Sequence, residues 1–418
     1  MDARATRDAT DGPLDTSVPV VVLKMHHGSL GIARTLGRLG IAVYCLTARR
    51  GLWAESSRYW RGVYDWDVEN APVSLTLDFL LDLGRRLGSM PLLIAVSDRT
   101  ALFVAEHADT LASAFRFPRV PYALAEGLTS KKNMYFLARR CGIPTADTQF
   151  PQSREELIGL IDGTRFPVLL KGIDGVRLQA RTGRTMAIVR DAAELLEQYD
   201  RLEDPASPNL MLQEYIPGGE DSVWMFNGYF DDESRVLMGM TGQKIRQTPP
   251  YTGSTSLGIV RTNAEVAALT SRFMRAIGYR GILDIGFRYD ARDGQYKVLD
   301  VNPRIGSTFR LFVARNGLDV ARVLYRHMTG QSVPAASAIE GRKWIVEDQD
   351  LFSCRRYRRD GRLNVVQWIA SFKGLREGAW FAWDDLRPFS MMCRMLAGSG
   401  GRWIARKVTL PLRRKAIP

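Results

Sequence analysis

The chain has 418 residues, 45% of them hydrophobic and 25% charged, which is enough for two or three globular domains of ordinary size. No window approaches 18 consecutive apolar residues, which excludes a membrane-spanning helix. Of the four histidines only His26 and His27 adjoin, which argues against a His-based triad or zinc centre. The four cysteines lie far apart without metal-ligand spacing, as expected of free thiols in a reducing cytoplasm.

The first 19 residues are polar and lack the apolar core of a signal sequence, so we predict a disordered leader over residues 1–19. A buried-type strand at 20–23 is followed by the loop "HHGSLG", the helical pattern "IARTLGRLG" and the strand "IAVYCL". This order predicts a small α/β domain over residues 20–125. Gly28 and Gly31 give only a G-x-x-G spacing, which favours a tight turn into a helix over a dinucleotide site. The strand "PLLIAVSD" ends in Ser97 and Asp98, where an α/β sheet presents ligand-facing groups.

The region 126–335 alternates helical and strand patterns. A helix begins after the capping residue Ser130 and ends at Gly142 and Pro144. We predict a strand ending in Lys171 in "FPVLLKGIDG", and a strand, a turn and a second strand in "NLMLQEYIPGGEDSVWMF". We predict a hairpin with an Asp-Gly turn in "GILDIGFRYDARDGQYKVLDVNPR" and a closing helix in "GLDVARVLYRHMTGQ". The segment "SVPAASAIEG" resembles a linker. The Trp- and Arg-rich extension at 336–418 has no pattern that predicts its fold.

Much of the net charge of +13 lies in this extension, in "CRRYRRDGR" and in the last 17 residues. A solvated basic surface and a polyanionic partner are both compatible with it. No zinc-finger, RRM or helix-turn-helix signature supports nucleic acid. For the basic C-terminus we favour a frayed, solvated end. The alternative is peripheral contact with an anionic membrane, at its inner surface in the cell.

Polar side chains stand at the ends of predicted apolar strands. Asp300 and Asn302 are two apart on a strand, so they share a face and offer hard oxygen ligands for Mg²⁺. Arg304 follows them and can hold a transferring phosphoryl group. Lys171 ends an apolar strand, where a lysine reaches either solvent or an anion. The segment "GQKIRQTPPYTGSTSLG" is either a surface loop or a substrate loop, and we favour the second because Lys244 and Arg246 share a strand face before it.

These motifs resemble the ATP-grasp superfamily, in the carboxylate–amine ligase branch that includes D-aspartate ligase-like proteins. The resemblance covers residues 20–335 and is strongest over 130–330. It implies an α/β (α+β) ATP-grasp fold with an N-terminal Rossmann-like pre-ATP-grasp domain. It also implies a small lid subdomain at about 126–215, a large subdomain at about 216–335, and a C-terminal extension.

The resemblance also implies site residues. Phosphate-binding lysines would be Lys131 in "SKKNMYFLARRCGIP" and Lys171 in "FPVLLK". The segment that would receive adenine consists of Gln213, Glu214, Tyr215 and Ile216, and the ribose would be bound by Glu220 or Asp221. The metal ligands would be Asp284, Asp300 and Asn302, and Arg304 would be catalytic. The loop segment itself, rather than the resemblance, places Lys244 and Arg246 near the substrate carboxylate or acylphosphate.

Three departures from the family pattern stand out. Asp300 replaces the usual Glu of the Glu-x-Asn-Pro-Arg motif. Gly286 occupies the position of the second metal-binding acid, so Asp284 is given that role. The usual Gly-rich phosphate loop is replaced by "GIDGVRLQARTGRTM", whose arginines we expect to face phosphate or an acidic substrate.

The activity implied is ATP-dependent ligation of a small-molecule carboxylate to an amine through an acylphosphate, with release of ADP and phosphate. The cofactors would be two Mg²⁺ ions, with Mn²⁺ as an alternative, and the enzyme would be cytoplasmic. The oligomeric state stays open, a homodimer being one alternative. Two rival functions also stay open: an ATP-dependent phosphotransferase on the same fold, and a weakly catalytic binding protein, which Asp300 and Gly286 favour.

Overall fold

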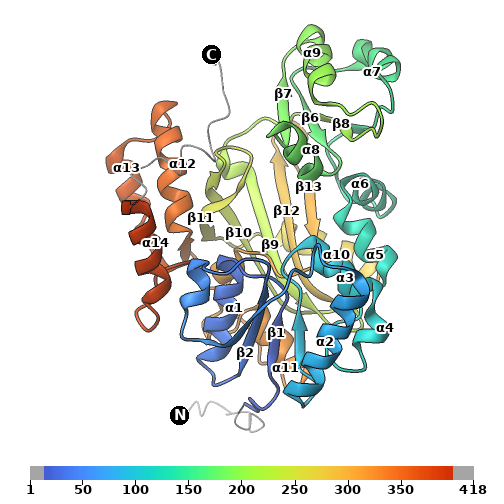
Figure 1. The fold of residues 1–418 in the computed structure, drawn as a ribbon. Coiled ribbons are helices and arrows are strands. Elements are labelled where there is room, and N and C mark those ends of the chain that lie inside the picture. The colour runs from blue at the N-terminus through green and yellow to red at the C-terminus, as the bar shows by residue number, and fades with distance from the viewer. Residues whose placement is uncertain (1–13, 399–418) are drawn as a thin grey trace, which may run out of the picture.

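The computed structural model describes residues 14–398, which form three β-sheets with helices packed on them (Figure 1). The predicted leader falls mostly outside the described residues. Its last part is packed, because Val18 is buried and its carbonyl accepts a hydrogen bond from the hydroxyl of Tyr325 at 3.0 Å. Ordered chain therefore begins before residue 20.

The N-terminal sheet is parallel, with the strand order β3-β2-β1-β4. Its strands are β1 (Val20–Val22), β2 (Val43–Thr47), β3 (Trp60–Asp65) and β4 (Leu92–Ile94). The helices of this region are α1 (His27–Gly37), η1 (Trp53–Ser56), α2 (Val73–Leu87), α3 (Asp98–Glu106), α4 (Ala108–Leu111), α5 (Tyr122–Thr129) and α6 (Lys131–Arg140). Ser130 caps α6 by accepting from the backbone N–H of Asn133, as the sequence predicts.

Helix α1 begins earlier than the sequence suggests. The predicted loop over 26–31 is wrong, because the ring Nδ1 of His26 accepts from the N–H of Gly28 at 2.9 Å and so caps a helix that begins at His27. Gly28 and Gly31 lie inside the helix. A Cβ atom at Gly28 would come within 2.7 Å of the Ser307 Cα, and one at Gly31 within 2.8 Å of the Arg310 Cγ. The two glycines therefore serve close packing of α1 on the segment after β13.

A second, antiparallel sheet has the order β5-β8-β6-β7 and forms the upper right of Figure 1. We call it the lid sheet. Its strands are β5 (Thr148–Gln149), β6 (Val168–Gly172), β7 (Met186–Val189) and β8 (Leu210–Glu214), and its helices are α7 (Arg154–Leu160), η2 (Ile161–Gly163), α8 (Gly175–Thr182) and α9 (Ala192–Leu202). Leu157, Leu170, Leu195 and Leu212 form its own small core, so the lid sheet is packed independently of the large sheet.

The large sheet has seven strands in the order β13-β12-β9-β10-β11-β14-β15. They are β9 (Val223–Phe230), β10 (Val236–Thr248), β11 (Ser254–Val260), β12 (Gly281–Asp290), β13 (Gln295–Asn302), β14 (Lys343–Ile345) and β15 (Leu375–Gly378). The helical elements of this part are η3 (Glu220–Ser222), α10 (Ala264–Ala276), η4 (Phe309–Leu311) and α11 (Val320–Met328). The predicted hairpin is confirmed as β12–β13. One face packs on α10 and α6, and the other packs toward α1 and α11, so the sheet is covered on both sides.

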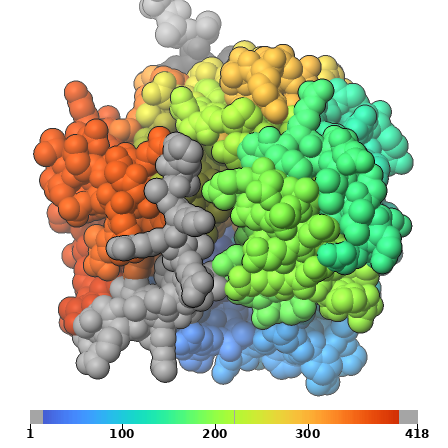
Figure 2. All heavy atoms as spheres, turned by 90° about the horizontal axis from the view of Figure 1, so that it is seen from above, coloured from blue at the N-terminus to red at the C-terminus, as the bar shows by residue number. Residues whose placement is uncertain are grey.

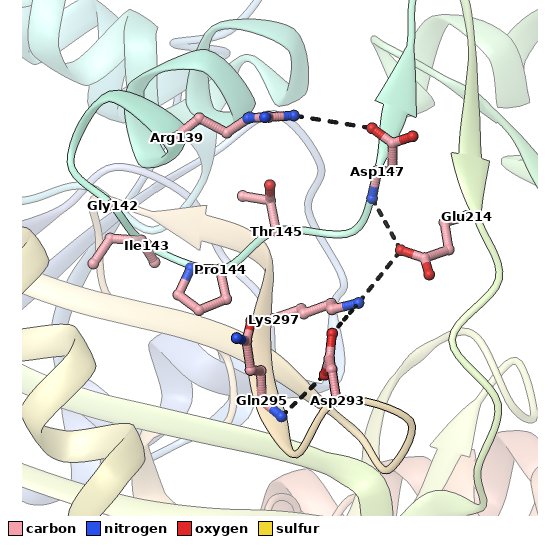
Figure 3. Close-up of a pocket in the computed structure, with 10 residues that line it drawn as sticks. All are labelled: Arg139, Gly142, Ile143, Pro144, Thr145, Asp147, Glu214, Asp293, Gln295 and Lys297. Atoms are coloured by element: carbon pink, nitrogen blue, oxygen red, sulfur yellow. Dashed lines mark hydrogen bonds and ion pairs between the residues drawn. The ribbon is translucent and has the colours of Figure 1, made fainter.

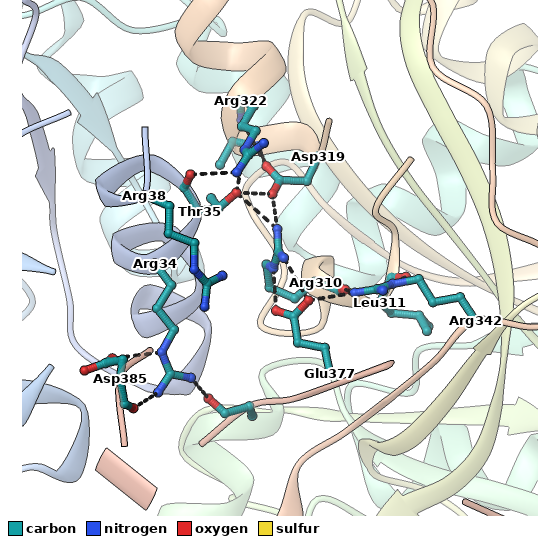
Figure 4. A network of polar contacts seen from close by, with 12 residues as sticks. Arg34, Thr35, Arg38, Arg310, Leu311, Asp319, Arg322, Arg342, Glu377 and Asp385 are labelled. Atoms are coloured by element: carbon teal, nitrogen blue, oxygen red, sulfur yellow. Dashed lines mark hydrogen bonds and ion pairs between the residues drawn. The ribbon is translucent and has the colours of Figure 1, made fainter. Parts of the chain in front are cut away.

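The C-terminal extension is part of the main body. It contributes β14, β15 and the helices α12 (Glu347–Arg359), α13 (Val365–Ala370) and α14 (Arg387–Gly398), which stand on one flank of the molecule (Figures 1 and 2). Buried ion pairs attach it. Glu377 accepts from Arg310 and Arg342, and Asp385 accepts from Arg34 of α1 (Figure 4). Within residues 14–398 no helix has the length and apolar character needed to cross a bilayer.

Candidate functional site

A row of oxygen-bearing side chains crosses three strands of the large sheet. Asp284 on β12 lies directly opposite Asn302 on β13 and, on its other side, opposite Asn227 on β9. Residues directly opposite in adjacent strands have their Cβ atoms about 5 Å apart and share a face. Asn227 is fully buried, and its side-chain oxygen has no hydrogen-bond partner among the described residues. An unpaired, buried amide oxygen beside a carboxylate indicates a site for a cation or a donor.

Asp300 lies two residues before Asn302 on β13 and on the same face of the sheet. Its partner across the ladder is Gly286, and a Cβ atom there would come within 2.5 Å of the Asp300 Oδ1. The absence of a side chain at 286 therefore makes room for the Asp300 carboxylate, which also accepts from the Nδ2 of Asn302 at 3.0 Å. The structure brings Asp284, Asp300 and Asn302 together at the end of one hairpin.

Arg304 connects this row to the N-terminal domain. Its Nε donates to the Oδ1 of Asp98 at 2.7 Å, and its Nη2 donates to the Oδ1 of Asn302 at 3.1 Å. Asp98 is the first residue of α3, after β4. The C-terminal edge of the parallel sheet therefore lies beside the end of the β12–β13 hairpin. The sequence predicts Asp98 as a ligand-facing residue but assigns it no role.

Two lysines of the lid region lie near each other and near this row, since the charges of Lys131 and Asp300 both act on Lys171. Lys171 on β6 donates to the Oε1 of Gln213 on β8 at 2.7 Å, and Lys131 at the start of α6 donates to the carbonyl of Ile173 at 3.5 Å. The first residue of α8, Gly175, lies beside Lys131: a Cβ atom there would be 3.5 Å from its Nζ. An ammonium group beside a helix N-terminus, with a second ammonium group nearby, is suited to hold phosphate.

The pKa values of Lys171 and Asp284 are both shifted in a way that agrees with this geometry. Burial, together with the nearby charge of Lys131, lowers the pKa of Lys171 to about 8, while the charge of Asp300 acts in the opposite direction. Burial raises the pKa of Asp284 to about 6, against the charge of Arg304. At neutral pH each group is still mostly charged although burial disfavours its charge, and a ligand of opposite charge would offset that cost in each case.

The segment between the lid sheet and the large sheet is held by Arg288 of β12, a residue that sequence reasoning missed. Its guanidinium donates to the carbonyl of Ile216 at 2.8 Å and to that of Gly218 at 2.7 Å. Ile216 itself is buried, Tyr215 is partly buried, and Asp221 is exposed. No sequence motif marks Arg288, because its partners are backbone carbonyls 70 and 72 residues away.

Glu214 points away from Lys171. Its carboxylate forms an ion pair with Arg292 of the hairpin. It also contacts Lys297 and accepts from the N–H of Asp147 at 3.1 Å (Figure 3). Glu214, Lys297 and Asp147 line a polar pocket of about 450 Å³. Gln213 faces the lysine side and Glu214 the opposite side, as alternation along β8 requires. The side chain of Glu214 is therefore held in an ion-pair cluster.

The structure separates Lys244 from Arg246. β10 carries register shifts between Lys244 and Gln247, which break the strand alternation there. Lys244 donates to the carbonyl of Gly253 at 3.1 Å, and its positive charge acts to lower the pKa of Asp284. Arg246 is buried, with its guanidinium on the Asp350 carboxylate at 2.7 and 2.9 Å. The interpretation of both as one cationic face is wrong, and the predicted substrate loop is a tight β10–β11 hairpin.

The arginines that follow Lys171 also have other partners. The predicted loop is largely the helix α8, capped by Asp174. Arg177 donates to Ser207 at 2.9 Å, Arg181 to the carbonyl of Leu202, and Arg184 to Gln198 at 3.5 Å. They therefore hold α8 against α9 and the segment that follows it.

The residues at the hairpin end fit a magnesium ion. Among the described residues no three His, Cys, Asp or Glu side chains form a cluster able to hold a metal. Mg²⁺ is commonly bound by one or two carboxylates together with substrate phosphates and water. Two aspartates, the free oxygen of Asn227 and the oxygen of Asn302 form such a set.

The chain is similar to known proteins in its sequence and in its fold. No family model matches the chain. The D-aspartate ligase of Enterococcus faecium (strain Aus0004) is 29% identical over 247 residues, which are 55% of this chain and 57% of that protein, so the match covers less than two thirds of the relative's length.

Two solved structures share the fold. The L-amino acid ligase from Bacillus licheniformis superimposes with a TM-score of 0.57 at 14% identity, over 78% of this chain and 76% of its own. The biotin carboxylase domain of Hydrogenobacter thermophilus 2-oxoglutarate carboxylase, solved with MgADP, gives 0.58 at 19% identity, over 77% and 72%.

Proposed function

We propose that the chain is an ATP-grasp enzyme, an ATP-dependent carboxylate–amine ligase that forms an amide bond through an acylphosphate; its fold and its similarity to a D-aspartate ligase support this. The observation that carries the proposal is the convergence of lysines and acids on one space. Lys131 and Lys171 come from the lid region, and Asp284, Asp300 and Arg304 come from the hairpin end, and the charge of Asp300 acts on Lys171.

The first step would transfer the γ-phosphoryl group of ATP to a substrate carboxylate. A carboxylate oxygen attacks the γ-phosphorus, the bond to the β–γ bridging oxygen breaks, and ADP leaves. Such a transfer depends on positioning and on offsetting charge. Lys131 and Lys171 would hold the phosphates, Arg304 would face the transferring group, and the backbone from Gln213 to Ile216, fixed by Arg288, would receive adenine. Glu220 or Asp221 stays our proposal for the ribose.

In the second step the neutral amine attacks the acyl carbon, the carbon–oxygen bond to phosphate breaks, and the amine proton passes to phosphate or solvent. Lys244 lies near Asp284 and would orient the acylphosphate. Arg246 is left out of this proposal because it is paired with Asp350. A divalent ion held by Asp284, Asp300 and Asn302 would offset the charge of the phosphate oxygens.

Similarity to a D-aspartate ligase supports ligation over simple phosphoryl transfer. The test is a screen of ADP release over carboxylates and amines, singly and in pairs, with mass analysis of the product. Ligation predicts ADP and free phosphate only when both substrates are present. A stable phosphorylated product would identify a phosphotransferase instead, and Mg²⁺-dependent ATP binding without any turnover would identify a binding protein.

Replacing Lys171 by Ala should weaken ATP binding by about 1.5–3 kcal/mol, since it removes a charge-assisted hydrogen bond to phosphate. Isothermal titration calorimetry with ATP measures the change. Lys132→Ala is the matched control, because Lys132 is the next residue after Lys131 but lies over the ring of Phe150, 5.5 Å from its centre. Equal affinity of the Lys171 variant and the parent would remove Lys171 from the phosphate site.

ATP affinity should also fall as the pH rises through 8. The pKa of Lys171 is lowered to about 8, mainly by burial, and only its protonated form attracts phosphate. The dissociation constant should therefore rise by up to about tenfold per pH unit above 8. Lys171→Met should abolish this dependence. A parent protein whose affinity is constant between pH 7 and pH 9, a range that brackets the pKa, would contradict the assignment.

A further inference from the structure

One face of α12 is a stripe of arginines. Arg355, Arg358 and Arg359 lie on it at helical spacing, and Arg362 follows one turn later, just beyond the helix end. All four are exposed, and within residues 14–398 none forms an ion pair with a carboxylate. The neighbouring Arg356 differs, because Asp360 accepts from it at 2.8 Å. Like charges at this spacing repel each other on a helix.

The next helix, α13, presents apolar side chains to solvent. Val366 is 75% exposed, Ile369 60% and Val365 43%, and no residue of α13 is buried. A tight connection of five residues joins α12 to α13, and the indole N–H of Trp368 donates to Asp350 at 2.9 Å, which turns α13 back along α12. The aliphatic groups therefore lie on the outer side of a helical hairpin whose inner side is fixed.

This hairpin forms the outer flank of the molecule, on the side away from α2 to α5 (Figures 1 and 2). Over residues 351–376 the chain has seven arginines and lysines and a single acidic residue, Asp360. We define the α12–α13 face by six residues: Arg355, Arg358, Arg359, Arg362, Val366 and Ile369. It combines unneutralised positive charge with exposed aliphatic carbon.

We propose that the α12–α13 face docks the protein on the surface of an anionic phospholipid bilayer. The arginines match the negative surface in charge, and such a surface attracts clustered basic residues. The aliphatic side chains on the adjoining helix would enter the boundary between headgroups and acyl chains. A nucleic acid would satisfy the arginines but would leave Val366 and Ile369 in water. The proposal is independent of the basic tail at 399–418, which lies outside the described residues.

The experiment is sedimentation of the full-length protein with vesicles of phosphatidylcholine, with and without phosphatidylglycerol. The charge variant replaces three arginines of the face by Gln: Arg355, Arg358 and Arg359. The matched control removes the same charge from three other exposed positions: Arg61, Arg85 and Arg165. A third variant carries Val366→Ser and Ile369→Ser. All these positions are exposed, and thermal unfolding verifies that each variant folds.

We expect the parent to bind only the anionic vesicles and the charge variant to lose about 100-fold in partition coefficient, at roughly fivefold for each basic residue. The control should bind as the parent does, and the serine variant should lose the binding that survives high salt. Equal binding by charge variant and control overturns the proposal. It is also overturned if the serine variant binds like the parent while a single-stranded oligonucleotide competes, which identifies a nucleic-acid surface. Loss of self-association in the serine variant, without any effect on vesicle binding, would assign the face to a second copy of the chain.

Discussion

Replacing Asp300 by Asn should lower the rate of ADP formation by roughly 10²–10³-fold, the loss typical of removing one charge-stabilising group from an active site. Asn has the same shape but carries no charge, so it weakens the attraction for a cation and leaves the packing unchanged. Gly286 opposite provides the space for either side chain. A steady-state assay with coupled ADP detection measures the rate, and thermal unfolding should show no loss of stability.

Two companion variants make this test specific. Asp284→Asn should cause a similar loss, since Asp284 lies opposite Asn302 in the same row. Asp293→Asn is the control, because Asp293 belongs to the same hairpin but contacts Lys297 on the side of the polar pocket. A fully active Asp284→Asn enzyme would show that another group acts as the second acid. If Asp300→Asn lowers stability and leaves the activity of the folded protein intact, Asp300 is structural.

Replacing Asp385 by Ala should lower the free energy of unfolding by about 3–5 kcal/mol, the cost of leaving a buried charge without its partner. Asp385 accepts from Arg34 Nε at 2.9 Å and from the Ser57 hydroxyl at 2.6 Å, and both charged side chains are almost fully buried. The change would strand the Arg34 guanidinium in the interior, where only carbonyls remain as partners (Figure 4). Urea denaturation measures the loss.

Asp384, the residue before Asp385, gives a control, because its partner Arg38 follows Arg34 by four residues. Asp384 pairs with Arg38, and the two side chains are 42% and 30% exposed. Asp384→Ala should cost only about 1 kcal/mol, because an exposed ion pair contributes little to stability. Equal losses in the two variants would mean that burial does not decide the strength of the attachment between the C-terminal extension and α1.

The sequence by itself determined the elements whose signals are local. Ser130 predicts the start of α6 because a capping hydroxyl acts within three residues, and the Asp-Gly turn predicts the β12–β13 hairpin for a similar reason. It also determined that Asp300 and Asn302 share a face, since alternation along one strand requires no partner. The resemblance carried by these motifs predicted the fold that the comparisons show.

Only the tertiary structure decided which distant residues meet. The register of β9, β12 and β13 places Asp284 between Asn227 and Asn302, and no periodicity within one strand encodes the offset between strands. The sequence predicts Arg246 as a substrate contact, but in the structure its guanidinium is buried and pairs with Asp350, 104 residues away. β14 and β15 are three and four residues long, too short for a pattern, and they are strands because an open edge of the large sheet accepts their hydrogen bonds. Contacts between segments far apart in the chain depend on the packing of the whole molecule, and local composition does not contain them.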